Sequence, residues 1–234
     1  MIVAATGRSH RTAAPRLEPA GVVRTAVCSN GASVYDMADR RIVRHRPIED
    51  GLGAALVEAL RAAHREASFG WETPDGFGWE HGFVQVAPVH VRDSLIDGSR
   101  DDELHESIED AGPVSLTKLL VGHPRIHSNE WLAVVAPLLP ESVQVSTSGA
   151  AFVEVTGDGV DKASTLAMVC AGLGIEASEV AAFGDQTNDV AMLEWAGRSW
   201  APENAHGSAV AVVDDVIGHH ADDGVAELIE SLID

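Results

Sequence analysis

The chain has 234 residues and is strongly acidic, with 16 lysines and arginines against 36 aspartates and glutamates and a formal net charge of −20. Nucleic acids and anionic membranes require a basic surface, so this charge excludes both as partners. There is no stretch of about 18 consecutive apolar residues and no basic-then-apolar leader, so we expect neither a membrane span nor secretion. The two cysteines, Cys28 and Cys170, form no CxxC pair, which favours a reduced, cytoplasmic protein.

Residues 1–35 contain short apolar runs that end in small polar turns. Runs of this kind, bounded by turn residues, predict buried strands. In chain order we expect a strand over residues 2–6 that ends in Thr6-Gly7-Arg8, a helix over 9–17, a strand over 25–28 that ends in Ser29-Asn30-Gly31, and an extended segment over 32–35.

A different pattern begins near Asp36. The apolar residues of 52–67 recur at helical spacing, and the segments that follow are short and of both kinds. We expect helices over 52–67, 104–111 and 129–139, strands over 83–87, 115–121 and 143–146, and a polar loop over 93–102. This mixture predicts an α+β block of about a hundred residues.

From residue 151 onward strands and helices alternate, which predicts a parallel sheet covered by helices. We expect strands over 151–155, 180–183 and 199–201, and helices over 162–173, 188–196, 205–212 and 225–232. The sequence thus predicts an α/β protein whose core domain is in two pieces, residues 1–34 and 149–234, around an inserted domain over residues 35–148. Ligands of such sheets bind beyond the carboxyl ends of the strands, where the polar turns lie.

The segment Gly184-Asp185-Gln186-Thr187-Asn188-Asp189 follows an apolar strand and leads into a helix. Two carboxylates and an amide at a strand tip are hard oxygen ligands of the kind that Mg²⁺ prefers. Asp and Asn are also favoured as helix caps, where they serve hydrogen bonding alone. By itself the segment is compatible with a magnesium site and with a capped helix start.

Lysine is rare in this chain, which contains only Lys118 and Lys162. Lys162 follows Gly159-Val160-Asp161 and opens a predicted helix, where its charge adds to the positive end of the helix dipole. That position is unfavourable unless an anion offsets it, and a phosphate is one candidate. The alternative is a solvated surface lysine beside an Asp161 helix cap.

Together these two segments resemble the carboxyl-terminal half of the Cof-type phosphatases, which belong to the haloacid dehalogenase superfamily. The resemblance rests on Gly159-Val160-Asp161-Lys162 and on residues 184–193. Ala5-Thr6-Gly7-Arg8 resembles the family's second motif. Supporting matches are Cys28-Ser29-Asn30-Gly31-Ala32, Asn204-Ala205 and residues 220–225. The resemblance extends over the whole chain and is weakest over residues 36–145.

The resemblance implies a Rossmann-like parallel-sheet core with an α+β cap inserted over residues 35–148, Mg²⁺ as cofactor and a small phosphorylated metabolite as substrate. The residues that it assigns to the phosphate are Thr6, Gly7, Arg8, Lys162 and Asn188. It assigns the metal to Asp185 and Asp189, with Asn188 and Asp189 also orienting Lys162, and it gives the catalytic roles to Lys162 and Asp185. We expect Thr6, Lys162 and Asp185 to converge at one edge of the core sheet. A homo-oligomer is left open.

The chain departs from the family at its most important motif. Family members begin with an apolar strand that ends in Asp-x-Asp-Gly-Thr, whose first aspartate attacks phosphorus and whose second acts as acid and base. No such sequence occurs here, and Met1–Thr6 leads directly into what resembles the second motif. That run is either the family's second strand or its first strand fused to the second motif. We expect the chain as given to be catalytically inactive. The alternatives are a pseudo-phosphatase that binds a phosphorylated ligand and a fragment of an enzyme gene.

Two weaker signals lie in the predicted insert. His123 and His127 are four residues apart, but Pro124 interrupts any helix between them, so we expect surface positions rather than a zinc site. Trp71, Trp79 and Phe83 are expected in the core of the insert.

Overall fold

The computed structural model describes residues 1–86, 103–111, 115–126 and 128–233. The chain divides into two compact units, Met1–Val160 and Asp161–Asp234. In the described residues the first unit contains a four-stranded and a six-stranded sheet, and the second contains a three-stranded sheet. The predicted loop over 93–102, and His127, lie outside the described residues. No helix in the described ranges is long and apolar enough to cross a bilayer.

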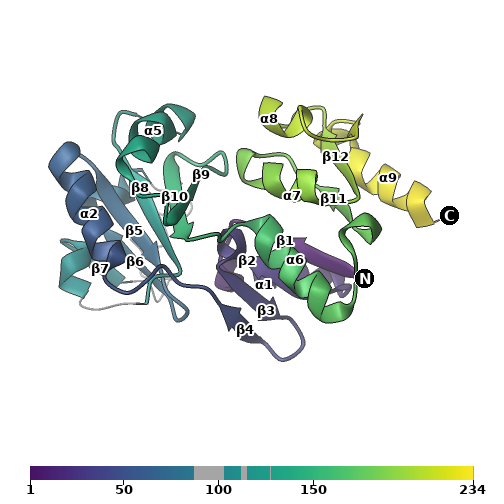
Figure 1. Cartoon of the computed structure of the whole chain (residues 1–234), viewed down its shortest axis with the longest axis horizontal. Helices are drawn as coiled ribbons and strands as arrows, with labels where there is room; N and C mark the ends of the chain where they lie inside the picture. Colours follow the sequence, from purple (N-terminus) through teal and green to yellow (C-terminus); the bar gives the residue numbers. More distant parts are fainter. Residues whose placement is uncertain (87–102, 112–114, 127, 234) are drawn as a thin grey trace. The chain divides into compact units, whose positions relative to one another are not determined.

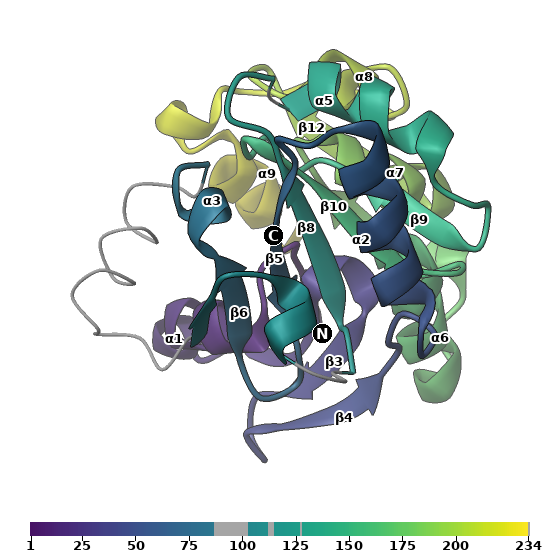
Figure 2. The ribbon, with the colours of Figure 1, turned by 90° about the vertical axis from the view of Figure 1, so that its left-hand side faces the viewer.

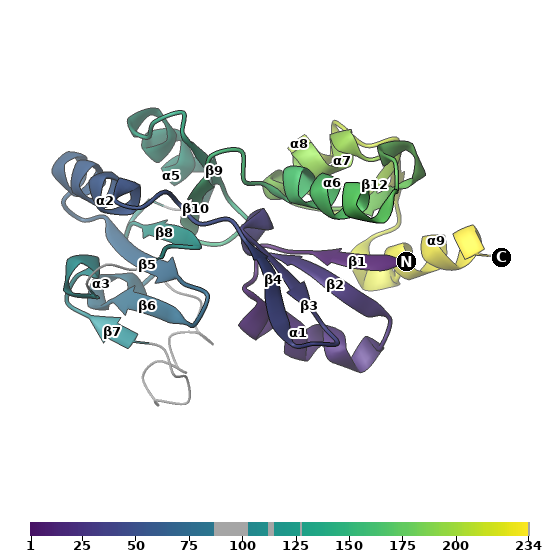
Figure 3. The ribbon, with the colours of Figure 1, turned by 60° about the horizontal axis from the view of Figure 1, so that its bottom comes forward.

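The four-stranded sheet has the order β1-β2-β3-β4, which Figure 3 shows with α1 along one face. Its strands are β1 (Ile2–Ala5), β2 (Val23–Cys28), β3 (Ser33–Asp36) and β4 (Arg41–His45). β1 pairs with β2 in parallel, and the other two pairs are antiparallel. Helix α1 (His10–Leu17), extended by η1 (Glu18–Ala20), buries Ala13 and Ala14 against Ala26, Cys28 and Tyr35 of the sheet. These small side chains allow the helix to approach the strands closely.

The six-stranded sheet has the order β7-β6-β5-β8-β10-β9. Its strands are β5 (Ser68–Glu72), β6 (Phe77–Glu80), β7 (Glu103–His105), β8 (Lys118–Gly122), β9 (Val143–Ser146) and β10 (Phe152–Gly157). All pairs are antiparallel except β6 with β7. The accompanying helices are α2 (Leu52–Ala63), α3 (His81–Val84), η3 (Ile108–Ala111), α5 (Ser128–Val135) and η4 (Ala136–Leu138).

The two faces of this sheet differ because side chains alternate along a strand. One face packs on α2 and α5 (Figure 2) and forms the main core, in which Trp71 and Trp131 are fully buried. On the other face Trp79, Phe83 and Leu120 form a smaller cluster. The predicted burial of Trp71, Trp79 and Phe83 is therefore confirmed.

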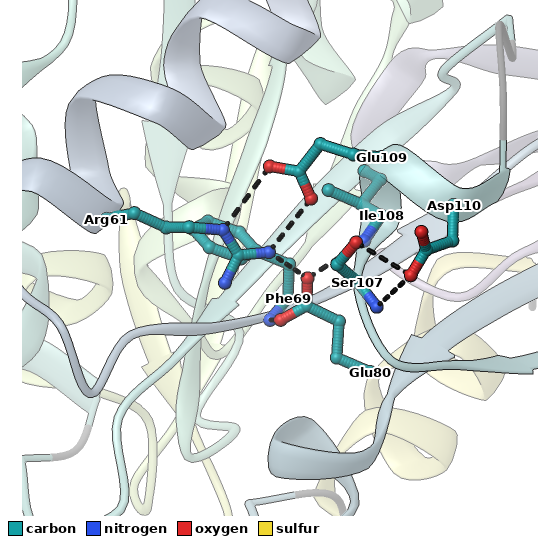
Figure 4. A network of polar contacts seen from close by, with 7 residues as sticks. All are labelled: Arg61, Phe69, Glu80, Ser107, Ile108, Glu109 and Asp110. Atoms are coloured by element: carbon teal, nitrogen blue, oxygen red, sulfur yellow. Dashed lines mark hydrogen bonds and ion pairs between the residues drawn. The ribbon is translucent and has the colours of Figure 1, made fainter.

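A polar network holds the edge of this sheet near η3 (Figure 4). The Arg61 guanidinium of α2 donates to Glu80 of β6 and to Glu109 of η3, the latter at 3.2 Å, and stacks over the Phe69 ring. The backbone N–H groups of Phe69 and Ile108 donate to the Glu80 carboxylate at 2.9 and 3.0 Å. The buried carboxylate thus joins a helix, two strands and a turn.

The second unit is a three-stranded parallel sheet in the order β11-β12-β13. Its strands are β11 (Ala181–Phe183), β12 (Arg198–Pro202) and β13 (Asp215–Ile217). Its helices are α6 (Lys162–Leu173), η5 (Ala177–Glu179), η6 (Thr187–Asp189), α7 (Val190–Trp195), α8 (Gly207–Val210), η7 (His220–Asp222) and α9 (Gly224–Ile233). The expected α/β alternation is confirmed here, and each strand leads into a turn or helix that carries polar residues.

Several predictions of local structure were wrong. The predicted strand over 83–87 was wrong: α3 ends at Val84, and the next two residues form a turn in which the Val86 N–H donates to the Phe83 carbonyl. Phe83 and Val86 are both buried and three residues apart, which is helical spacing, and residue 87 lies outside the described residues. The predicted helix over 104–111 contains β7 and the short η3, and α2 ends at Ala63 rather than at residue 67. His123 is buried, not on the surface, and its Nδ1 accepts hydrogen bonds from the backbone N–H groups of Arg125 and Ile126.

Candidate functional site

An ion pair between the two predicted site residues Lys162 and Asp189 lies inside the second unit. The Lys162 Nζ donates to Asp189 Oδ1 at 2.6 Å, and both side chains are 6% exposed. Lys162 begins α6, where Asp161 is the N-cap and accepts from the Ser164 N–H at 2.6 Å. The anion that offsets Lys162 at the helix start is therefore supplied by the chain itself. Asp161 is the helix cap, but the alternative of a solvated surface lysine was wrong, because Lys162 is buried.

Asp189 also shapes the turn after β11. Its Oδ2 accepts from the backbone N–H groups of Asp185 at 3.1 Å and Gln186 at 3.0 Å. A Cβ added at Gly184 would lie 2.6 Å from the Asp189 Cβ, so only glycine permits this close approach. The result is a tight loop at the carboxyl end of β11, held by one buried carboxylate.

Asp185 is the exposed carboxylate of this loop. Its Oδ2 accepts from the Gln186 side chain at 3.2 Å, and its backbone carbonyl accepts from the His206 N–H at 2.8 Å. Asn188 lies on η6, half-buried, between the two aspartates in sequence. The backbone is thus fixed while the Asp185 carboxylate faces solvent, as a cation ligand would require.

The carboxylates described here fit a magnesium ion only in part. Asp185 offers one exposed carboxylate, whereas both oxygens of Asp189 already accept hydrogen bonds. Within the described ranges, no group of three or more His, Cys, Asp or Glu side chains is arranged to hold a metal. Mg²⁺ commonly keeps several waters and binds through one or two carboxylates plus substrate phosphate, so Asp185 fits such a site as a single ligand.

The turn Thr6-Gly7-Arg8 lies at the carboxyl end of β1 in the first unit. The Thr6 N–H donates to the Val27 carbonyl at 2.9 Å, and the Thr6 Oγ1 accepts from the Arg8 N–H at 3.1 Å. The turn therefore continues the β1–β2 ladder and then folds back on the threonine hydroxyl. Because that oxygen is an acceptor for Arg8, its own hydrogen remains to be donated.

A second turn, Ser29-Asn30-Gly31, follows β2 and supports the first. Its N–H groups at Ser29 and Asn30 donate to the carbonyls of Arg8 at 2.8 Å and Thr6 at 3.1 Å. All three of its residues have positive φ, at 53°, 57° and 101°. Serine rarely adopts this left-handed conformation, whereas asparagine tolerates it better than most residues, and non-glycine residues held there cluster at sites of function.

Thr6 belongs to the first unit, and Lys162 and Asp185 belong to the second. The predicted convergence of Thr6, Lys162 and Asp185 therefore stays a prediction. Within its own unit, the Thr6-Gly7-Arg8 turn follows the parallel strand β1 and the Asp185–Asp189 loop follows the parallel strand β11, whereas Gly159–Lys162 follows the antiparallel strand β10.

A buried charged cluster, formed by Glu72, Lys118 and Glu154, was not predicted from the sequence. The Lys118 Nζ lies 2.6 Å from Glu154 Oε1 and 4.0 Å from Glu72 Oε2, and all three side chains are at most 5% exposed. Burial acts to lower the pKa of Lys118, but Glu154 and Glu72 outweigh it and raise that pKa. Burial raises the pKa of Glu72 despite the opposing effect of Lys118. The rarity of lysine was the one available signal.

Cys28 lies at the end of β2 near the same cluster. Burial raises the pKa of the Cys28 thiol to about 12, and Glu72 adds to the shift. A thiol with such a pKa stays protonated at neutral pH and is unreactive. Cys28 is therefore part of the packing and is no candidate nucleophile.

The chain shows similarity to known proteins over most of its length. A family model described as haloacid dehalogenase-like hydrolase matches residues 1–229. The pyridoxal phosphate phosphatase YbhA of Escherichia coli is 24% identical, over 98% of this chain and 85% of that protein. The 5-amino-6-(5-phospho-D-ribitylamino)uracil phosphatase YcsE of Bacillus subtilis is 34% identical, but the match covers only 38% of this chain and 36% of that protein.

Solved structures show the same fold. The structure of SMU.1108c from Streptococcus mutans superposes with a TM-score of 0.83 at 16% identity, covering 99% of this chain and 85% of that one. The sugar phosphatase BT4131, of subclass IIB, superposes with a TM-score of 0.79 at 18% identity, with 99% and 85% covered.

Proposed function

Because the chain belongs to the haloacid dehalogenase-like hydrolase family, we propose that it is a phosphatase of the Cof type whose ligands are small phosphorylated metabolites. We propose further that these 234 residues are inactive as given, because the sequence contains no Asp-x-Asp-Gly-Thr. The alternative is a pseudo-phosphatase that only binds a phosphorylated ligand. The observation that carries the proposal is the ordered loop of Asp185–Asp189, fixed by the buried Lys162–Asp189 pair.

In this proposal each unit supplies phosphate-binding groups of its own. Thr6 donates its hydroxyl hydrogen, and the backbone of Gly7 and Arg8 lines the same turn. Lys162 offsets negative charge, with Asp189 holding its ammonium group in place. Donors and charges fixed before the ligand arrives stabilise a phosphoryl group without the cost of reorganisation.

Asp185, assisted by Asn188 and Asp189, is the proposed metal-binding edge. A bound Mg²⁺ would neutralise phosphate charge and polarise the phosphorus–oxygen bonds. The exposed Asp185 carboxylate supports this role, and the internal hydrogen bonds of Asp189 favour a role in holding Lys162.

The domain boundaries belong to the same proposal: a core of residues 1–34 and 149–234 that lacks either the family's first strand or the loop and helix after it, and a cap over 35–148. Two observations support it. β1 is an edge strand of the four-stranded sheet, and β11 is an edge strand of the three-stranded sheet. Each edge can pair in parallel with a further strand. The buried, unpaired thiols of Cys28 and Cys170 agree with a cytoplasmic location.

Adding back the absent motif tests the proposal. The unmodified chain should show no Mg²⁺-dependent hydrolysis of p-nitrophenyl phosphate. The same chain extended by a strand ending in Asp-x-Asp-Gly-Thr should gain turnover, and Lys162→Ala should then abolish it. The matched control is the extended chain with the first added aspartate changed to asparagine.

Turnover by the unmodified chain that depends on Asp185 would show that it contains an unrecognised nucleophile. If the extended chain stays inactive while the unmodified chain binds inorganic phosphate, the alternative is correct and the protein is a phosphate-binding pseudo-phosphatase.

A further inference from the structure

Lys118 makes a hydrogen bond to a backbone carbonyl in addition to its ion pairs with carboxylates. Its Nζ donates to the Gly7 carbonyl at 2.6 Å, in addition to the Glu154 carboxylate at 2.6 Å. An ammonium group buried among two carboxylates already has its charge compensated. The contact with Gly7 joins the six-stranded sheet to the turn after β1, both within the unit Met1–Val160.

Strand register brings the three charged side chains together. Glu72 of β5 lies directly across from Lys118 of β8, and Glu154 of β10 pairs with Leu120, two residues further along β8. Residues two apart on a strand share a face, so all three side chains project from the face opposite α2 and α5. The Ser29 hydroxyl donates to Glu72, which ties the second turn to the same cluster.

Each carbonyl of the first turn accepts a hydrogen bond. Thr6 accepts from the Asn30 N–H, Arg8 accepts from the Ser29 N–H, and Gly7 accepts from Lys118. In a trans peptide the C=O and the following N–H point in opposite directions. Lys118 on the Gly7 carbonyl therefore directs the Arg8 N–H away from the cluster and onto the Thr6 Oγ1, where it is found at 3.1 Å.

We propose that Lys118 is a positioning residue for phosphate, acting through the Gly7–Arg8 peptide on the Thr6 hydroxyl. With Oγ1 engaged as an acceptor for Arg8, the Thr6 hydrogen is available to an oxygen of the ligand. Glu154 fixes the ammonium group, and Lys118 fixes the peptide. This inference rests on the proposed function, because it takes phosphate as the ligand of the turn.

The experiment titrates the full chain with inorganic phosphate and follows backbone amides by ¹⁵N NMR, alongside hydrogen exchange. The variant is Lys118→Met, which keeps most of the side-chain volume and removes the donor. Arg61→Met is the matched control, since it breaks another carboxylate pair of the same sheet, Arg61 with Glu80, without touching the turn. Thr6→Val tests the phosphate role independently of Lys118.

We expect phosphate to shift the Gly7 and Arg8 amides of the unmodified chain. Lys118→Met should weaken phosphate binding by about tenfold, as expected for the loss of one positioned charge-assisted hydrogen bond. It should also speed exchange of the Ser29 and Asn30 amides, which donate to the turn, by at least about tenfold. Arg61→Met should leave the phosphate affinity and the exchange rates of the Ser29 and Asn30 amides close to those of the unmodified chain.

Equal hydrogen-exchange rates of the Ser29 and Asn30 amides in Lys118→Met and Arg61→Met would overturn the positioning role. Faster exchange of these amides in Lys118→Met with unchanged phosphate affinity would overturn it as well. If the unmodified chain binds no phosphate, or if Thr6→Val binds it normally, the phosphate role of the turn fails, whatever the exchange data show. Should Lys118→Met not fold, Glu154→Gln replaces it. Glutamine keeps the acceptor and loses the charge, and unchanged exchange and affinity in that variant would reject the proposal.

Discussion

The Lys162–Asp189 pair predicts an unequal response to removal of its two members. In Lys162→Met, Asp189 keeps two backbone N–H donors, from Asp185 and Gln186. In Asp189→Ala, a buried ammonium group loses its anion and two N–H groups lose their acceptor. Asp189→Ala should therefore be the more destabilising substitution.

The magnitudes follow from burial, since both side chains are 6% exposed and solvent screening is weak. Stranding one member of a buried pair costs about 3–5 kcal/mol, and each lost backbone hydrogen bond adds about 1 kcal/mol. We expect about 5 kcal/mol or more for Asp189→Ala and about 3 kcal/mol for Lys162→Met, with the two backbone bonds limiting the latter. The double variant should cost less than the sum by about 2–3 kcal/mol, as residues in direct contact do.

Urea denaturation of the four proteins in a double-mutant cycle, followed by circular dichroism, measures these free energies of unfolding. Thr165→Ser, a milder change to another buried residue of α6, serves as a control for that helix. Additivity of the two substitutions within about 0.5 kcal/mol would refute the view that Lys162 and Asp189 act as a unit. A larger loss for Lys162→Met than for Asp189→Ala would contradict the role of Asp189 in holding the loop.

Two further predictions concern the loop and the buried cluster. Gly184→Ala should cost about 1–3 kcal/mol, measured by denaturant unfolding, since its Cβ would lie 2.6 Å from the Asp189 Cβ; no loss would mean that the loop can shift. Burial raises the pKa of Glu72, so the native state retains a proton on this carboxyl at pH values where the unfolded chain has released it. The free energy of unfolding therefore falls as the pH rises from the pKa of Glu72 in the unfolded chain to its pKa in the folded chain. Glu72→Gln should remove this fall. Glu154 has a lowered pKa because Lys118, opposing the effect of burial, favours its charged form, so its contribution is present above the unfolded pKa and is lost in acid. Glu154→Gln should therefore lower stability at neutral pH, and the two variants changing stability in the same direction at pH 7 would contradict this reasoning.

The strand-and-helix alternation of the second unit was predictable because its elements carry clear boundary signals. α6 was predicted with its observed bounds, from Lys162 after the Asp161 cap to Leu173 before Gly174, which has left-handed φ of 70°. The N-cap aspartate and the glycine that ends the helix are local signals that can be recognised in the sequence. β13, of three residues, gave no such signal.

β5 and β6 were missed for a different reason. Every residue of β5 is buried, glycine included, so no alternation of polar and apolar residues marks it. The Trp71 ring of β5 packs directly against the backbone of Gly78 in β6, where an added Cβ would lie 2.0 Å from the ring. Such packing between strands cannot be read from one segment at a time.

The resemblance already implied that Asp189 orients Lys162, and the 2.6 Å pair between them depends on the turn that brings η6 to the start of α6. The contacts of Lys118 were not predicted. Lys118 was noted only for its rarity, because its three neighbours come from the turn after β1, from β5 and from β10. Long-range contacts of this kind set the electrostatics of both turns.

Both lysines of this chain form buried ion pairs, which affects the long-range electrostatic attraction of a phosphate. Lys162 pairs with Asp189 and Lys118 with Glu154, so neither contributes a free positive charge to attract ligand over distance. The chain as a whole carries −20, which repels a phosphate dianion. This repulsion extends over about 30 Å at 0.01 M salt and about 8 Å at 0.15 M.

Affinity for inorganic phosphate should therefore rise, by about two- to fivefold, as ionic strength increases from 0.01 to 0.15 M. Isothermal calorimetry measures it, with sodium acetate as the salt in one series and sodium chloride in another to reveal competition by either anion. A protein that captures phosphate through exposed cations shows the opposite trend, because salt screens an attraction. A fall in affinity in both series would mean that an uncompensated positive site dominates, and Lys162 would then have to exchange Asp189 for the ligand.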